Sequence, residues 1–404
     1  MTLKTLHLLL TSIIVGMLLG FFGATAAHYF RAGIDFLGNT SKNYFQNTSG
    51  FLFYFCALSL SAFIITLIKN GFKITRWHGP ADTIFAAHRI DNELDVKTGV
   101  ASTLAAFVSA AGGASVGQYG PLVHFGATLG AFIKATLKLS ITTNVILGGG
   151  VAAAISAGFN APLAGIIFAH EAILRHFSPK ALAPIALASG TAFAVHSYLW
   201  ETSTPFLQSY TAMEIGPMIL ISITAGPFFG LVALLFMSAV LLFSKLPSQM
   251  GLTSFQSLLI AITGLSAIGT FYPQVMGIGT STILDLTNTN TLLLVALSIL
   301  IAKIIATALS LGFGFFGGVF SPALLVGAAA GDCRSELYRT TVISRTGTCN
   351  MWYGCGRRSS DRRSFVYDNN STRAYRILWS RSSIYGGHSH HNNDKQSVIW
   401  EFNF

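Results

Sequence analysis

The chain has 404 residues, of which 52% are hydrophobic and only 10% are charged, and its mean hydropathy is +0.59. Soluble domains carry about 25% charged residues, so this composition excludes an ordinary soluble protein and indicates a polytopic membrane protein. The net charge of +10 does not point to nucleic acid, because the basic residues are scattered in loops or crowded into the last segment and form no basic stripe. The four cysteines form neither a zinc spacing nor a disulfide framework, and we expect no metal or cofactor.

The apolar segments follow one another along most of the chain. Residues 8–30 predict a first transmembrane helix, and residues 51–68 predict a second. Lys69, Lys73 and Arg76 crowd the next turn, and the positive-inside rule places this turn, and with it the N-terminus, in the cytoplasm. A short helix over residues 78–89 is too polar to span. Further apolar segments cover residues 98–111, 121–138, 143–157, 161–175, 180–199, 212–243, 255–272 and 291–311.

Several of these segments are shorter than the roughly 20 residues that cross a bilayer, and glycine or proline interrupts many of them. Broken helices at membrane depth are tolerated only where protein or a watery cavity surrounds them. The pattern therefore favours a transporter or channel over a simple membrane anchor.

Two of the interrupted segments repeat each other. GQYGPLVHFGATLG, at Gly117–Gly130, aligns with GVFSPALLVGAAAG, at Gly318–Gly331, and both read Gly-x-x-x-Pro followed by a later Gly-Ala and Gly. They lie in opposite halves of the apolar region. Paired interrupted segments of this kind are the best pointer in a sequence to a binding site built from structural repeats.

Each repeated segment has the features of a helix start that faces inward. Proline suits the first helical turn, and the preceding glycines let the backbone turn tightly. The N–H groups of such a start carry partial positive charge and can bind an anion. The alternative is that these are merely closely packed helices of small residues. The predicted anion-binding residues are Gly117, Gln118, Tyr119, Gly120, Gly318, Val319, Phe320 and Ser321.

Three stretches resemble the CLC family of chloride channels and chloride–proton exchangers. They are GQYGP (117–121), AGFNAPLAGIIFAHEAI (157–173) and GFFGGVFSPALLVGAAAG (314–331), and the resemblance covers roughly residues 1–331. It implies an all-α polytopic membrane fold with inverted repeats and broken helices. It also implies a homodimer in the lipid bilayer, in which backbone N–H groups of converging helices hold chloride or another small anion in each subunit.

The chain departs from the family pattern at three places. His78 and Gly79 stand where the family has a serine-bearing segment, and we expect them at the anion site. Tyr119 replaces the gating glutamate, while Glu171 matches the first of two inner glutamates and Ala172 the second. Tyrosine, with an ordinary pKa near 10, stays neutral. We therefore expect passive chloride permeation with Tyr119 as the gate and Glu171 as an inner polar position; the alternative is proton-coupled exchange through another carboxylate.

Gly113-Ala114-Ser115-Val116-Gly117 fits the Gly-x-Ser-x-Gly pattern of serine hydrolases. That pattern requires a strand–turn–helix context, whereas this stretch is rich in glycine and bounded by helices. An intramembrane serine hydrolase is a remote alternative, and we expect no enzyme.

The character of the chain changes at Asp332, which divides a predicted transmembrane domain (1–331) from an aberrant basic tail (332–404). The codons of Met351-Trp352-Tyr353 read one base out of frame encode Cys-Gly followed by Met or Thr, and residues 390–396 similarly yield membrane-like residues. We hypothesise that the tail is translated out of frame, which would truncate the second half of the fold. An inert product is then a further alternative, and the nucleotide sequence of the gene decides the matter.

Overall fold

The computed structural model describes residues 3–44, 50–89, 93–139, 141–200, 215–288 and 292–340. Within these ranges the chain forms helices and no named strand, which confirms the predicted all-α class. The predicted tail lies outside the described residues apart from residues 332–340.

In the part of the chain that the structure describes, six helices contain stretches that are long and apolar enough to cross a membrane. The first two reproduce the predicted first and second spans, although the first helix extends well beyond residues 8–30 in both directions. The multi-pass organisation predicted from the composition is therefore confirmed. These helices are α1 (Leu3–Tyr44), α2 (Gly50–Gly71), α8 (Pro179–Trp200), α9 (Ile215–Gln249), α10 (Ser254–Phe271) and α12 (Leu293–Gly312).

The remaining helices are shorter or begin inside the fold, as the interrupted pattern predicts. Two elements between residues 273 and 288, η2 and α11, had no counterpart among the predicted segments. They are polar and short, so hydropathy alone gave no signal for them. The elements are α3 (Pro80–His88), α4 (Val96–Ala111), α5 (Tyr119–Leu137), α6 (Thr143–Phe159), α7 (Pro162–Phe168), the π-helix η1 (Ala169–Leu174), the 3-10 helix η2 (Pro273–Val275), α11 (Thr280–Asn288) and α13 (Phe320–Thr340).

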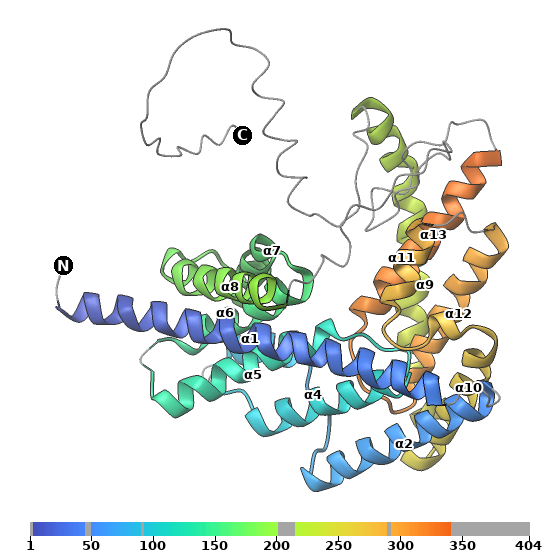
Figure 1. Ribbon diagram of the computed structural model, residues 1–404, viewed down its shortest axis with the longest axis horizontal. Helices are drawn as coiled ribbons and strands as arrows, with labels where there is room; N and C mark the ends of the chain where they lie inside the picture. The colour runs from blue at the N-terminus through green and yellow to red at the C-terminus, as the bar shows by residue number, and fades with distance from the viewer. Residues whose placement is uncertain are drawn as a thin grey trace. The chain divides into compact units, whose positions relative to one another are not determined.

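Helix α6 packs against α1, α5 and α8, and α12 packs against α9 and α13 (Figure 1). Small residues bring α5 and α6 together: a Cβ atom on Gly126 would lie 2.3 Å from the carbonyl oxygen of Gly150, and one on Gly150 would lie 2.0 Å from that of Gly126. Such close approach is typical of membrane helices, which associate through small residues. It fixes α5, and so the start of α5, against the centre of the bundle.

Candidate functional site

The two repeated segments meet at an isolated antiparallel bridge between Gly117 and Gly318. The N–H of Gly117 donates to the carbonyl oxygen of Gly318, and the N–H of Gly318 donates to that of Gly117, both at 2.7 Å. There is no room for side chains here: a Cβ atom on Gly117 would lie 2.9 Å from Cδ of Pro322, and one on Gly120 would lie 3.2 Å from Cα of Gly318. The bridge therefore places the starts of α5 and α13 side by side, as the repeat predicts.

Five backbone N–H groups at these helix starts make no hydrogen bond with any residue that the structure describes. They belong to Tyr119 and Gly120 at the start of α5, and to Val319, Phe320 and Ser321 at the start of α13. By contrast, Gly117 and Gly318 use their N–H groups on each other, and the N–H of Gln118 donates to Oγ of Ser321 at 3.4 Å. Neither helix has an acidic residue in its first turn. Two positive helix ends with unspent donors thus lie next to each other, which is the physical requirement for anion binding.

Three aromatic rings gather at the same place. The ring of Tyr119 stacks on that of Phe159 with 3.9 Å between centroids, and Phe320 meets both edge-on, at 5.9 Å from Tyr119 and 5.3 Å from Phe159. Tyr119 is only 5% exposed, whereas Phe320 is 44% exposed. Gly158 makes room for the tyrosine, because a Cβ atom there would lie 3.2 Å from the Tyr119 ring. The ring of Tyr119 therefore packs against two apolar rings, beside the unpaired N–H groups of the helix starts.

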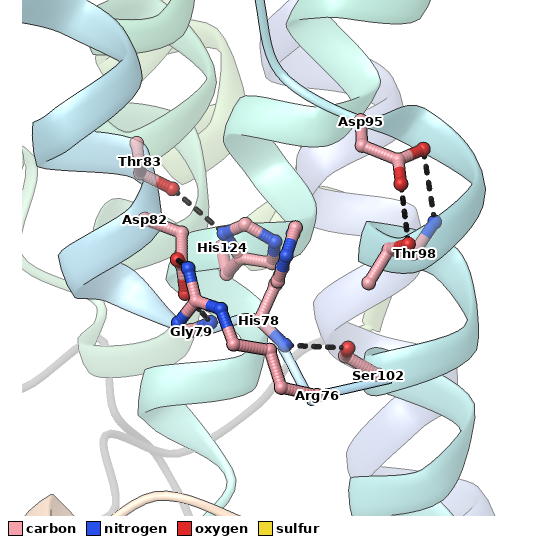
Figure 2. Close-up of polar contacts among 9 residues, drawn as sticks. All are labelled: Arg76, His78, Gly79, Asp82, Thr83, Asp95, Thr98, Ser102 and His124. Carbon is pink, nitrogen blue, oxygen red and sulfur yellow. Dashed lines mark hydrogen bonds and ion pairs between the residues drawn. The ribbon is translucent and has the colours of Figure 1, made fainter. Parts of the chain in front are cut away.

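The third predicted segment, His78 and Gly79, also reaches this region. A Cβ atom on Gly120 would lie 3.7 Å from Cγ of Pro80, which opens α3. However, the N–H of His78 donates to Oγ of Ser102 at 2.9 Å, and the N–H of Gly79 donates to the carboxylate of Asp82 at 2.8 Å (Figure 2). These two predicted anion donors are thus occupied by partners within the chain.

The carboxylate of Asp82 is held in its ionised form by its surroundings. Partial burial raises its pKa, but the hydrogen bond from Gly79, the nearby His78 and the ion pair with Arg76 outweigh this and lower the pKa below its ordinary value. The guanidinium of Arg76 lies 2.5 Å from Oδ1 of Asp82. Asp82 thus supplies a negative charge at the start of α3.

A buried polar network stabilises the loop before α5. The hydroxyl of Ser115 donates to the carbonyl oxygen of Val275 at 3.1 Å and lies 3.1 Å from Oγ1 of Thr307, while its N–H donates to Oγ of Ser310. Ser115 is fully buried and lies between helices rather than on a strand–turn–helix element. This context does not fit a nucleophilic serine.

Lys303 of α12 is part of the same network and was missed in the sequence. Its ammonium group is fully buried and donates to the carbonyl oxygens of Val275 at 2.8 Å and Gly277 at 3.0 Å. The N–H of Gly277 in turn donates to the carbonyl oxygen of Gly113. A single lysine inside an apolar span is costly and therefore usually functional or structural, and this was the signal that could have identified it.

Two cavities lie at opposite ends of α4. One, of about 950 Å³, includes Asp95 and Val96 at the start of α4 in its lining, together with Arg76, Asp82 and Lys134. The other, of about 360 Å³, includes Ala111 and Gly112 at the end of α4, together with Arg31 and Gly277. Each cavity thus carries at least one basic side chain in its lining.

The predicted inner position, Glu171, lies on the π-helix η1 and is exposed in the described chain. No hydrogen bond or ion pair joins it to a described residue at the starts of α5 and α13. Its role stays a prediction. Among the described residues, no group of His, Cys, Asp and Glu could hold a metal ion.

Comparison with known proteins identifies a family. The family model described as voltage gated chloride channel matches residues 60–353. The chain is similar to a putative chloride channel protein ClcB-like of Ralstonia nicotianae, with 26% identity over 65% of this chain and 63% of the relative. It is also similar to the H(+)/Cl(-) exchange transporter ClcA of Vibrio cholerae, with 26% identity over 80% of this chain and 71% of the relative.

Solved structures agree on the fold. A slow cyanobacterial Cl-/H+ antiporter superimposes with a TM-score of 0.67 at 15% identity, covering 82% of this chain and 80% of that one. A CLC-type fluoride/proton antiporter gives a TM-score of 0.65 at 19% identity, covering 84% of each chain.

Proposed function

This chain belongs to the voltage gated chloride channel family, and from that premise we propose that it lets chloride or another small anion cross a membrane passively. The observation that carries the proposal is the set of five unspent N–H groups of Tyr119, Gly120, Val319, Phe320 and Ser321 at two adjoining helix starts. An anion there would accept hydrogen bonds from neutral donors, and its release would leave no buried cation behind. This suits a site that ions must both enter and leave.

Tyr119 supports permeation without stoichiometric proton coupling. A phenol stays neutral at ordinary pH, so the side chain does not compete with an anion as a carboxylate would. Its ring is held by Phe159 and Phe320, and we propose that displacement of this ring gates the path between the two cavities. Ala172 offers no titratable group at the inner position.

The proposed setting is a homodimer in a lipid bilayer with the N-terminus in the cytoplasm. The cluster of Lys69, Lys73 and Arg76 supports this orientation, because basic residues accumulate in cytoplasmic loops.

Proton-coupled exchange is the second candidate, favoured by the printed name of the Vibrio cholerae relative. The two are separated in liposomes that contain the purified full-length chain. Passive permeation predicts chloride efflux under a voltage clamp with no uphill movement of protons, whereas exchange predicts that a chloride gradient drives protons. Absence of any efflux would support the inert alternative.

The site itself is tested by an amide-to-ester replacement at Phe320, which removes one N–H and keeps the side chain. Because hydrogen bonds to charged groups contribute about 1.5–3 kcal/mol, chloride binding should weaken by about 10- to 150-fold. The matched control is the same replacement at Val326, whose N–H lies inside α13. It should lower the stability of the helix more and the chloride affinity less. Equal effects at both positions would refute this placement of the site.

A further inference from the structure

The cavity of about 360 Å³ at the end of α4 is lined by hydrogen-bond donors from three separate helices. Arg31 belongs to α1 and Tyr54 to α2, while Thr280 and Ser281 form the start of α11. The volume falls in the range of about 300–1,000 Å³ that is typical of pockets for small ligands. None of the residues at the starts of α5 and α13 lines this cavity, so its donors are not those of the candidate anion site.

Tyr54 brings a buried hydroxyl group to the cavity. The residue is only 6% exposed, and its ring is held between two glycines: a Cβ atom on Gly269 would lie 2.6 Å from the ring, and one on Gly113 would lie 3.7 Å from it. No hydrogen bond joins the hydroxyl to any residue that the structure describes. Native structures rarely leave a buried polar group unpaired, and Tyr54 lines the cavity. A ligand in the cavity would supply the missing partner.

The residues at the start of α11 add unpaired backbone donors. The N–H groups of Thr280 and Ser281 make no hydrogen bond with any described residue, and the first turn of this nine-residue helix contains no acidic side chain. Gly277 and Gly279, which precede the helix, have positive φ values of 63° and 80°, a conformation that glycine adopts readily. Successive N–H groups in such turns form concave sites that bind anions.

Positive charge exceeds negative charge around the cavity. The guanidinium of Arg31 makes no hydrogen bond with a described residue, and its ion pair with Asp35 is long, at 3.9 Å, with the Asp35 side chain 61% exposed. Such an exposed pair contributes little. The ammonium of Lys303 is fully buried behind the same loop, where its Nζ would lie 3.5 Å from a Cβ atom on Gly279. No described carboxylate pairs with Lys303, so its charge favours an anion in the cavity.

We propose that this cavity binds a phosphate group or a similar oxyanion. A monatomic ion would reach the donors on one wall of a cavity of this size, whereas the oxygens of an oxyanion can accept from several walls. Arg31 suits a bidentate contact with two of these oxygens, the start of α11 suits a third, and the Tyr54 hydroxyl can donate to the remaining one. The group belongs either to inorganic phosphate or to a phospholipid headgroup. The cavity lies at one end of the proposed anion path, but phosphate binding here does not require that the chain conducts chloride.

The test is calorimetric titration of the purified full-length chain with inorganic phosphate, at constant ionic strength and in detergent that contains no phospholipid. Tyr54→Phe removes only the hydroxyl and should weaken phosphate binding by about 10- to 150-fold, the effect of losing one hydrogen bond to a charged group. Arg31→Gln should weaken it at least as much, whereas Asp35→Asn should strengthen it by about two- to fivefold, because the competing carboxylate is removed. The matched controls, Tyr198→Phe and Arg175→Gln, change exposed residues on or beside other helices and should bind phosphate as the unaltered chain does.

A repeat of the titration in phosphatidylglycerol nanodiscs identifies the source of the phosphate group. Binding of inorganic phosphate that persists in the nanodiscs assigns the site to a soluble oxyanion, and binding that is lost there assigns it to the lipid headgroup. Failure of the folded, unaltered chain to bind phosphate in detergent, or equal binding by Tyr54→Phe, would overturn the proposal. Chloride titration of the same samples tests the proposed function separately: a chain that binds phosphate but no chloride retains this site and loses that function, and the reverse result removes this site alone.

Discussion

Replacing Gly117 with alanine should separate the two helix starts that form the candidate site. The added Cβ atom would lie 2.9 Å from the carbonyl oxygen of Gly318, 2.9 Å from Cδ of Pro322 and 3.0 Å from the nitrogen of Ser321, where ordinary contacts are 3.4–4 Å. These atoms belong to the backbone or to a proline ring, so no flexible side chain can move aside. The two segments must therefore shift apart by about half an ångström or more.

The cost follows from the bridge that this shift breaks. Two hydrogen bonds of 2.7 Å join Gly117 and Gly318, and each contributes about 0.5–1.5 kcal/mol. Gly117→Ala should thus lower the free energy of unfolding by about 1–3 kcal/mol. It should also weaken chloride binding by about tenfold or more, because the donors of α5 and α13 no longer point at one position.

Thermal unfolding and calorimetric chloride binding of the detergent-solubilised protein measure the two effects. Gly190→Ala is the matched control, since Gly190 is an exposed glycine of α8 with nothing within 4 Å of the added Cβ atom. It should leave chloride binding unchanged and stability equal or slightly higher. A Gly117→Ala protein that binds chloride as tightly as the unaltered chain would refute a site built on this bridge.

Three further changes test the surrounding structure. Lys303→Met leaves the carbonyl oxygen of Gly277 unpaired and removes one of the two donors to that of Val275, so we expect a net loss of about 2 kcal/mol in unfolding free energy, and an unchanged melting temperature would contradict this. Asp82→Asn should cost about 0.3–1 kcal/mol at neutral pH, because it removes the negative charge from the first turn of α3 and its ion pair with Arg76. Because the folded pKa of Asp82 is lowered, this contribution is present above the ordinary pKa of about 4 and is lost as the pH falls through the folded value, so melting curves should converge in acid. Ser115 is fully buried, so a fluorophosphonate probe should not label it, and labelling would revive the hydrolase alternative.

Much of this fold follows from the sequence, because the signals are local. Helices α5 and α13 begin two residues before Pro121 and Pro322. A proline in the first helical turn is tolerated because the N–H that it lacks would have no partner within the helix. The approximate positions of the apolar helices follow from hydropathy in the same way. The pairing of the two repeats could be suspected from their likeness, but the bridge between Gly117 and Gly318 depends on tertiary contact.

The residues that the sequence did not identify share one property, which is that their role depends on a distant partner. Phe159 matters because its ring stacks on Tyr119, and Lys303 because it reaches carbonyl oxygens 26 and 28 residues away. The spacing of nearby residues in the sequence indicates neither of these contacts. The same reason explains why sequence analysis treated the N–H of Gly79 as a donor for an external anion.

The three helix starts at the candidate site differ in how their positive ends are neutralised. Helix α3 has Asp82 in its first turn, and this carboxylate accepts the Gly79 N–H and pairs with Arg76. Helices α5 and α13 have no acidic residue in their first turns. A helix start that already holds a carboxylate has little attraction left for a second anion, because the two like charges would repel each other. We therefore propose that an external anion binds between α5 and α13, and that α3 borders the path without binding the ion directly.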